Sequence, residues 1–236
     1  MAWLLKTYVY ISDSKVDMLY PQIPQKRLSK IATELKINLG ILSLKFGHQP
    51  TEKNRQDKLN LIIRYLKEEG AVGTVDSTKE YFEGVLPMRG TPWPYIEKGM
   101  VYFGGTTKSG TVLGLGGSIH HCIGELRGET DTRSYSGLGP LITKLTEELD
   151  PARYGQLMNM YHSARGLDGR RLELTDELVL RLTAEVTRYD ISGPTQNLEF
   201  VAKRLVESLA VPDLWHDPNT KLHVVLGTPI YVAQVD

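Results

Sequence analysis

The chain has 236 residues, of which 41% are apolar, and its 28 basic side chains balance 28 acidic ones. This length and composition are typical of one large or two small folded domains, and they exclude a largely disordered chain. The zero net charge argues against nucleic-acid binding, which is typical of chains with a basic excess or a basic stripe.

The chain contains a single cysteine, Cys122, so no intramolecular disulfide can form. This fits a reducing cytosol. The N-terminal segment MAWLLKTYVYIS is interrupted by Lys6 and lacks the apolar core of an export signal. No apolar run approaches the ~20 residues that a membrane helix needs. We therefore expect a cytoplasmic protein without membrane contact.

The first third of the chain predicts strands and helices in alternation. Residues 7–12 (TYVYIS) are β-branched and aromatic, which is typical of a strand. Two prolines within residues 13–25 predict a loop there. Apolar spacing then predicts a helix over 26–36, a strand over 41–46 and a helix that begins after Thr51 and ends at Gly70.

Residues 72–124 are rich in glycine and proline and show no helical period. Segments 81–88, 100–105 and 111–117 are typical of strands, and residues 106–110 of a hairpin turn. We therefore expect an antiparallel meander. Residues 118–124 (SIHHCIG) are a candidate for one further strand.

The remainder of the chain predicts four helices, over residues 138–149, 154–164, 174–189 (capped by Thr175) and 195–210. It ends with a β-rich segment, residues 221–236. A strand that follows helices usually returns to a sheet already present. We predict an α+β fold in one domain, residues 1–236, with a mostly antiparallel sheet packed against helices. This domain can be divided into a sheet-rich part, residues 1–136, and a helical part with a closing strand, residues 137–236.

The segment TVLGLGGSIHHCIGE, residues 111–125, concentrates glycine, histidine and the cysteine. A phosphate-binding loop requires a lysine that is absent here, a dinucleotide fingerprint requires a third glycine at the correct spacing, and a nucleophile elbow requires a glycine where His120 stands. No metal-binding motif is present either, and we predict neither a metal nor another cofactor.

If residues 118–124 form a strand, Ser118, His120 and Cys122 share one face, and His121 lies on the buried face. His120 and His121 are then candidates for acid–base catalysis, and Cys122 for a nucleophile or a substrate contact. Alternatively, a helix start at this point would let the backbone around Gly116, Gly117 and Ser118 stabilise an oxyanion. The simpler interpretation is a glycine-rich strand with a buried cysteine.

A second polar segment, residues 12–22, follows the first strand. Asp13, Lys15 and Asp17 alternate, so in an extended chain they share one side. They are candidates for a general base with an electrostatic partner, or for an ion pair that fixes a turn.

Large apolar side chains on or beside the meander are the third candidate feature. They either line an apolar substrate pocket or fill an ordinary core; they include Tyr81, Phe82, Met88, Trp93 and Tyr102.

The segments YVYISDSKVDMLYPQIP, YFEGVLPM, VYFGG, LGLGGSIHH and VVLGTPIYVA together resemble an uncharacterised family of bacterial proteins that begin with a Y-x-Y-[VI]-S-D-[ST]-K-V-D-M-L segment. The resemblance covers nearly the whole chain, and the opening segment is its most specific part. It implies a cytosolic protein from specialised-metabolite or biological-conflict loci, without a settled activity.

Three hypotheses follow. The first is an acid–base cyclase, or a related enzyme, on an acyl, polyketide-like substrate. The second is a ligand-sensing or adaptor module without catalysis. The third is a structural protein that self-associates into a homo-oligomer through the C-terminal YVAQV and the aromatic loop. The enzyme is favoured because glycine, serine, histidine and cysteine coincide with a second polar segment.

Overall fold

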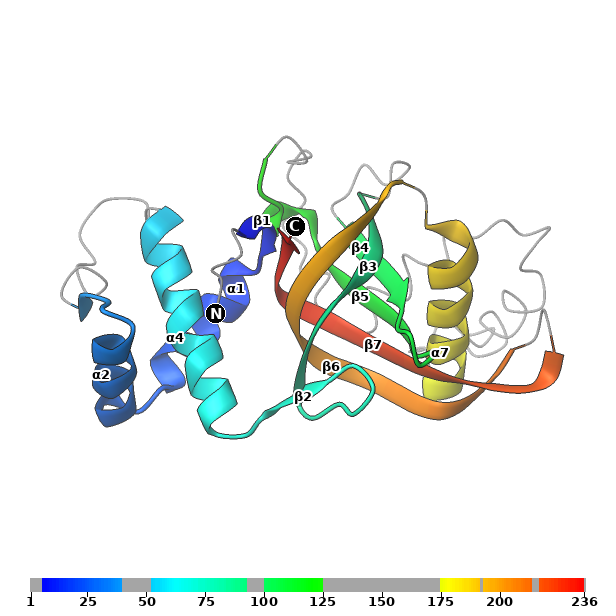
Figure 1. Ribbon diagram of the computed structural model, residues 1–236, viewed down its shortest axis with the longest axis horizontal. Helices are drawn as coiled ribbons and strands as arrows, with labels where there is room; N and C mark the ends of the chain where they lie inside the picture. Colours follow the sequence, from blue (N-terminus) through cyan, green and yellow to red (C-terminus); the bar gives the residue numbers. More distant parts are fainter. Residues whose placement is uncertain are drawn as a thin grey trace, which may run out of the picture.

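The computed structural model describes residues 6–39, 52–92, 100–124, 175–191, 193–213 and 217–235 (Figure 1). The strand predicted over 41–46 and the helices predicted over 138–149 and 154–164 lie outside these residues, as does Trp93.

Seven strands form one sheet: β1 (Lys6–Ile11), β2 (Val72–Thr74), β3 (Tyr81–Pro92), β4 (Met100–Thr106), β5 (Val112–Ser118), β6 (Thr195–Asp213) and β7 (Asp217–Val235). The strand order is β1-β7-β5-β4-β3-β2, and β6 pairs with both β3 and β7. Because β6 joins β3 to β7, the strands β3, β4, β5, β7 and β6 pair in a closed ring. Figure 1 shows the long, bent β6 and β7 that make this closure.

The predicted meander is confirmed, because β3, β4 and β5 pair antiparallel in sequence order. The turn between β4 and β5 is also confirmed: the Gly110 amide donates to the Thr107 carbonyl at 3.0 Å, and Gly110 has a φ of 93° that favours glycine. The closing strand does return to the sheet. The sheet is mixed, since β2 pairs parallel with β3 and β5 pairs parallel with β7.

The helix predicted over residues 195–210 is wrong, because this segment is strand β6. Leu198 and Phe200 face the interior of the closed sheet, whereas Val201 contacts the helices on its outside. Leu209, which would share one face of a helix with Leu198 and Leu205, is 71% exposed. Backbone pairing with β3 on one side and β7 on the other outweighed the helical spacing of the leucines.

The described helices and helical turns are α1 (Asp13–Leu19), η1 (Tyr20–Gln22), α2 (Gln25–Glu34), α4 (Glu52–Glu68), η2 (Ile119–His121), α7 (Asp176–Glu185) and the π-helical turn η3 (Val186–Asp190). Helices α2, α4 and α7 confirm the predictions for their segments. Thr175 caps α7, and Gly70, with a φ of 67°, follows the end of α4.

The loop predicted over residues 13–25 is wrong, because α1 begins directly after β1. The Ser12 side chain caps this helix by accepting from the Lys15 amide. Pro21 lies in the first turn of the following 3-10 helix η1, where a missing amide is tolerated. The prolines therefore end α1 rather than prevent it.

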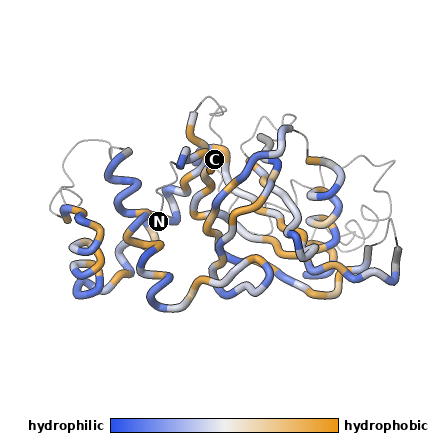
Figure 2. Tube along the Cα trace, viewed as in Figure 1, coloured by the Kyte–Doolittle hydropathy of each residue, from blue (hydrophilic) through white to orange (hydrophobic). Residues whose placement is uncertain are grey.

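The closed sheet separates three groups of core residues. Its interior is filled by side chains that include Tyr10, Phe82, Phe103, Leu115 and Phe200. Helix α7 covers one outer side, and α1, α2 and α4 cover another (Figure 1). Figure 2 shows that the central strands are largely apolar, while α2 and α4 mix apolar and hydrophilic residues. The interior is thus a packed core.

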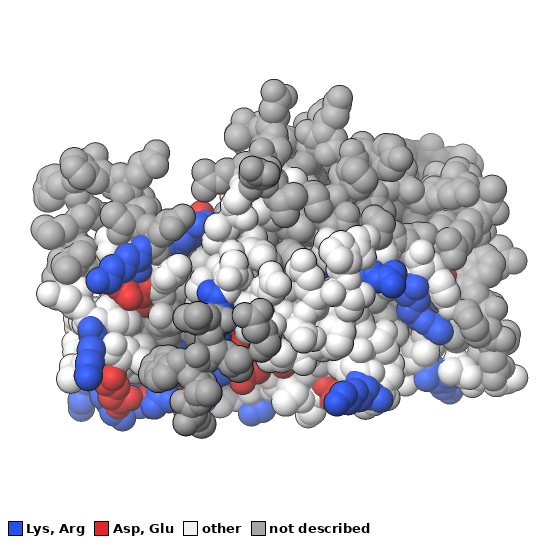
Figure 3. Space-filling model, turned by 45° about the horizontal axis from the view of Figure 1, so that its top comes forward, with Lys and Arg blue, Asp and Glu red and all other residues white. Residues whose placement is uncertain are grey.

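The described surface carries both signs of charge. At the helical end, basic and acidic side chains lie next to one another (Figure 3) and form ion pairs such as Arg27–Glu69 and Arg64–Glu34. None of the helices in the described part of the chain has the length and apolar character that crossing a bilayer requires.

Candidate functional site

The two polar segments singled out in the sequence meet in space. The Asp13 amide donates to His121 Nδ1 at 3.3 Å, and His121 Nε2 lies 3.0 Å from Ser14 Oγ. We call Ser12, Asp13, Ser14, Lys15 and His121 the polar corner.

Of the two alternatives for residues 118–124, the strand is wrong, and a helix start is closer to the structure. Ser118 ends β5, and its side chain accepts from the His120 amide to begin the 3-10 turn η2. The turn redirects His121 towards α1, so the two histidines do not alternate on strand faces. The His120 side chain is half-buried beside the corner.

The two aspartates of α1 pair with helix α4 rather than with Lys15. Asp13 forms an ion pair with Arg55, and Asp17 lies 3.3 Å from Lys58. Burial raises the pKa of Asp13, but the hydrogen bond to His121 and the charge of Arg55 outweigh it, so the pKa is lowered overall. The alternation expected for an extended chain is wrong, because the helix turns Lys15 away from both carboxylates.

Lys15 points into the protein and is 8% exposed. Its Nζ lies 3.4 Å from the hydroxyl of Ser12, which is fully buried. Burial, and next the nearby charge of Lys203, lowers the pKa of Lys15 to about 8. Of the three α1 residues predicted to be catalytic, Lys15 has the most unusual surroundings.

Tyr10 is a residue that the sequence reasoning did not single out. Its ring packs edge-on against His121, with 5.8 Å between centroids, and against Phe103. Its hydroxyl is buried without a hydrogen-bond partner among the described residues. Alternation along the first strand places Tyr10 in the interior, and that signal could have found it.

The glycines of β5 make room for aromatic rings. A Cβ atom on Gly117 would lie 2.4 Å from the Tyr10 hydroxyl, and one on Gly114 would lie 2.0 Å from the Tyr102 hydroxyl. Gly116 and Gly117 pair with β4, opposite Tyr102 and Val101. Close packing therefore accounts for the glycine-rich segment, as the simpler interpretation held.

Most residues proposed to contact a substrate lie in the core. Tyr81, Phe82, Met88 and Tyr102 are at most 5% exposed. Cys122 is 1% exposed, and burial raises the pKa of its thiol to about 12, which keeps the thiol protonated and unreactive near neutral pH.

A second polar network joins β6 and β7 to the loop before β3. His223 Nε2 lies 2.8 Å from Glu207 Oε1, and His223 Nδ1 lies 3.0 Å from Thr111 Oγ1. Thr111 Oγ1 donates a hydrogen bond to Asp76 at 2.5 Å. The network therefore links β6 and β7 to the segments before β3 and β5.

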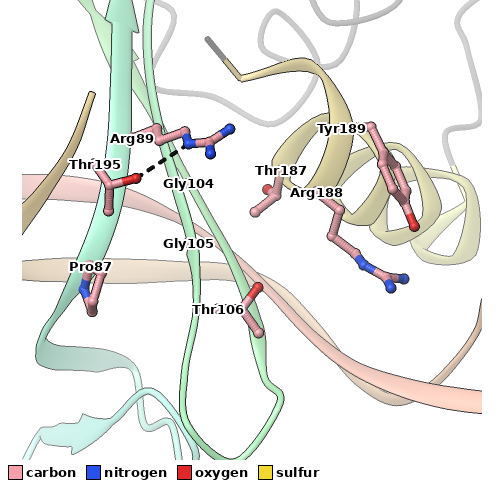
Figure 4. Close-up of a pocket in the computed structure, with 9 residues that line it drawn as sticks. All are labelled: Pro87, Arg89, Gly104, Gly105, Thr106, Thr187, Arg188, Tyr189 and Thr195. Atoms are coloured by element: carbon pink, nitrogen blue, oxygen red, sulfur yellow. Dashed lines mark hydrogen bonds between the residues drawn. The ribbon is translucent and has the colours of Figure 1, made fainter. Parts of the chain in front are cut away.

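A cavity of about 370 Å³ lies on the outside of the closed sheet. Strand residues form one wall and the turn η3 forms the other (Figure 4). Its lining residues are Pro87, Arg89, Gly104, Gly105, Thr106, Thr187, Arg188, Tyr189 and Thr195. We call it the arginine cavity.

The described part of the lining is cationic, because it includes two arginines and no acidic residue. Arg89 is held by Thr195 Oγ1 at 3.4 Å and by the Ile191 carbonyl at 3.3 Å. These contacts use Nε and Nη1, and within the described part of the chain no hydrogen bond engages Nη2, which could therefore donate to a ligand. The Arg188 guanidinium lies 5.3 Å from the centroid of the Tyr189 ring. The sequence reasoning missed this cavity, because its arginines lie about 100 residues apart and form no motif.

Together these features define an α+β protein with a closed mixed sheet, an outer cationic cavity and a polar corner. The chain belongs to a family of unknown function, DUF7019, whose sequence model matches residues 6–236. Comparison with curated proteins and with solved structures gives no match. Among the described residues, no group of three histidine, cysteine or acidic side chains could hold a metal ion.

Proposed function

We propose that the protein binds a small anionic molecule in the arginine cavity and acts as a ligand-recognition module. The observation that carries this proposal is that the described lining of the cavity contains two arginines, Arg89 and Arg188, and no acidic residue. Guanidinium groups bind carboxylates and phosphates through paired hydrogen bonds.

The dimensions and polarity of the cavity favour this ligand class. A volume of about 370 Å³ lies in the range of small-molecule sites. Hydroxyl groups of Thr106, Thr187 and Thr195 add polar partners around the arginines. A phosphate-bearing ligand with a small organic part fits this combination better than a purely apolar chain does.

A thermal-shift screen tests the proposal. One panel holds inorganic phosphate and mono-, di- and cyclic nucleotides; the other holds acyl thioesters and β-keto acyl mimics. A ligand that binds the folded state raises the melting temperature by mass action. We expect phosphate-bearing compounds to give the shift.

Two variants and one control locate the binding. Arg89→Gln and Arg188→Gln should each abolish most of the shift, whereas Arg27→Gln, which removes a surface arginine of α2, should leave it unchanged. An equal shift in all four proteins would place the ligand elsewhere and contradict the proposal.

An acid–base enzyme, in its most specific form a cyclase on an acyl chain, is the second candidate. It is favoured by the contact of His121 with Asp13 and Ser14, which unites the two predicted segments. The packed interior weighs against it, because the aromatic side chains that would hold an acyl chain already fill the core. Turnover of an acyl compound that is lost in folded His121→Ala protein would establish this function; full turnover in that variant would reject it.

A further inference from the structure

Lys15 is a buried amine without an acidic partner. It is 8% exposed, and among the described residues no carboxylate pairs with it; its hydrogen bond goes to the Ser12 hydroxyl at 3.4 Å. Other lysines on this side of the molecule are paired, such as Lys58 with Asp17 and Lys67 with Glu83. A lysine is rarely buried unless it is paired, so this arrangement requires an explanation.

A second cation and an unpartnered hydroxyl lie on the same side of the sheet. Lys203 of β6, which itself pairs with Glu80 at 3.5 Å, is near enough to Lys15 for its charge to be felt there. It lies directly opposite Thr228 of β7, so the two side chains share one face of the sheet. Thr228 is 2% exposed, and its hydroxyl has no partner among the described residues.

These surroundings favour the neutral amine. Burial, together with a neighbouring cation, lowers the pKa of Lys15 to about 8. Near neutral pH the Lys15 amine is then unprotonated in roughly a tenth of the protein molecules. For an exposed lysine, this fraction is far less than a hundredth. Desolvation beside another cation is a known way to make a lysine nucleophilic.

We propose that Lys15 is a carbonyl-reactive amine that forms an imine with a small aldehyde or ketone. The Nζ lone pair attacks the carbonyl carbon, and the carbonyl oxygen takes up a proton to give a carbinolamine. Loss of water then forms the C=N bond, so the amine and the carbonyl compound yield the imine and one water molecule. The Ser12 hydroxyl, 3.4 Å from Nζ, is placed to relay the proton. The limited exposure of Lys15 restricts the partner to compounds of a few carbon atoms.

Reductive trapping of the native protein tests this proposal without any variant. The protein is treated at pH 7 with limiting acetaldehyde and sodium cyanoborohydride, and the ethylation of each lysine is followed by peptide mass spectrometry. Lys30, whose side chain is 60% exposed, is the internal reference. We expect Lys15 to react at least tenfold faster than Lys30. An equal or lower rate for Lys15 would overturn the proposal.

The pH profile separates activation from mere accessibility. The rate at Lys15 should level off above about pH 8, whereas the rate at Lys30 should still rise at pH 10. The advantage of Lys15 should disappear in urea-unfolded protein. Parallel profiles for the two lysines, or an advantage that survives unfolding, would overturn the proposal. The proposed anion binding concerns other residues, so each proposal can fail without the other.

Discussion

His121 lies against Ser14, which precedes it by 107 residues, with 3.0 Å between Nε2 and Oγ. This contact joins the turn after β5 to the first turn of α1. It connects the end of the meander with α1, so two distant polar segments become one polar corner.

A double-mutant cycle on this pair should give a coupling of about 0.5–1 kcal/mol, because Ser14→Ala removes a partner of His121, whose side chain is only 13% exposed. The variants are Ser14→Ala, His121→Ala and their combination, compared by urea unfolding. His121→Ala combined with Ser29→Ala, on helix α2, provides the control and should be additive. Additivity of the first pair would mean that the contact contributes nothing.

Gly117→Ala should destabilise the protein by about 2–4 kcal/mol, because the added Cβ would lie 2.4 Å from the buried Tyr10 hydroxyl. Tyr10→Phe alone should be neutral or stabilising, since that hydroxyl lacks a hydrogen-bond partner in the described structure. The combined variant should recover part of the loss, which calorimetry would measure. If Tyr10→Phe instead increased the loss of stability caused by Gly117→Ala, the Tyr10 hydroxyl would have a favourable partner.

Glu207→Gln should cost about 1–2 kcal/mol at pH 7 and almost nothing at pH 3. Burial opposes ionisation of Glu207, but hydrogen bonds from Thr78, His223 and Arg204 outweigh it and lower its pKa. Because the folded pKa is depressed, the stabilisation is present above the ordinary glutamate pKa and is lost as the pH falls through the folded value.

Urea unfolding of wild type and variant between pH 7 and pH 3 measures the difference. Glu177→Gln, at a side chain that is 60% exposed on α7, is the matched control and should change stability by less than about 0.5 kcal/mol. A constant difference for Glu207→Gln across this range would show that the carboxylate charge is not responsible.

Lys15→Met should stabilise the protein at pH 7, by on the order of 2 kcal/mol. The folded state lowers the pKa of Lys15 from 10.5 to about 8, so it disfavours the protonated amine. This penalty is fully present below about pH 8. It vanishes as the pH approaches the pKa that the Lys15 amine has in the unfolded chain. The gain of the variant should therefore shrink to near zero by about pH 10.5.

The control is Lys30→Met, at an exposed position of α2, for which no such pH dependence is expected. Destabilisation by Lys15→Met at pH 7 would show that the buried charge has a favourable partner, contrary to the contacts described.

Much of the fold could be predicted from local pattern. The meander, the turn at Gly110, the end of α4 before Gly70 and the Thr175 cap of α7 depend on residues close in sequence, and they are confirmed. The error at β6 has a non-local cause: its leucine spacing fits a helix, but β3 and β7 supply backbone partners on both sides.

The candidate site was predicted less completely. The sequence indicated His121, Asp13 and Lys15, and the structure brings the segments that contain them together. The sequence pattern did not predict that a helix would turn Lys15 away from Asp13. The arginine cavity depends on the approach of η3 to β3 and β4, a tertiary contact that has no trace in local spacing.

Arginine-selective ¹⁵N spectra, recorded during a titration with inorganic phosphate, would show whether an anion binds in the cavity lined by Arg89 and Arg188. We expect saturable shifts of the Nε signals of these two arginines, with the signals of Arg27 and Arg64 on the distant helices unchanged. No shift at the two cavity arginines, or an equal drift of all four signals, would contradict the proposal.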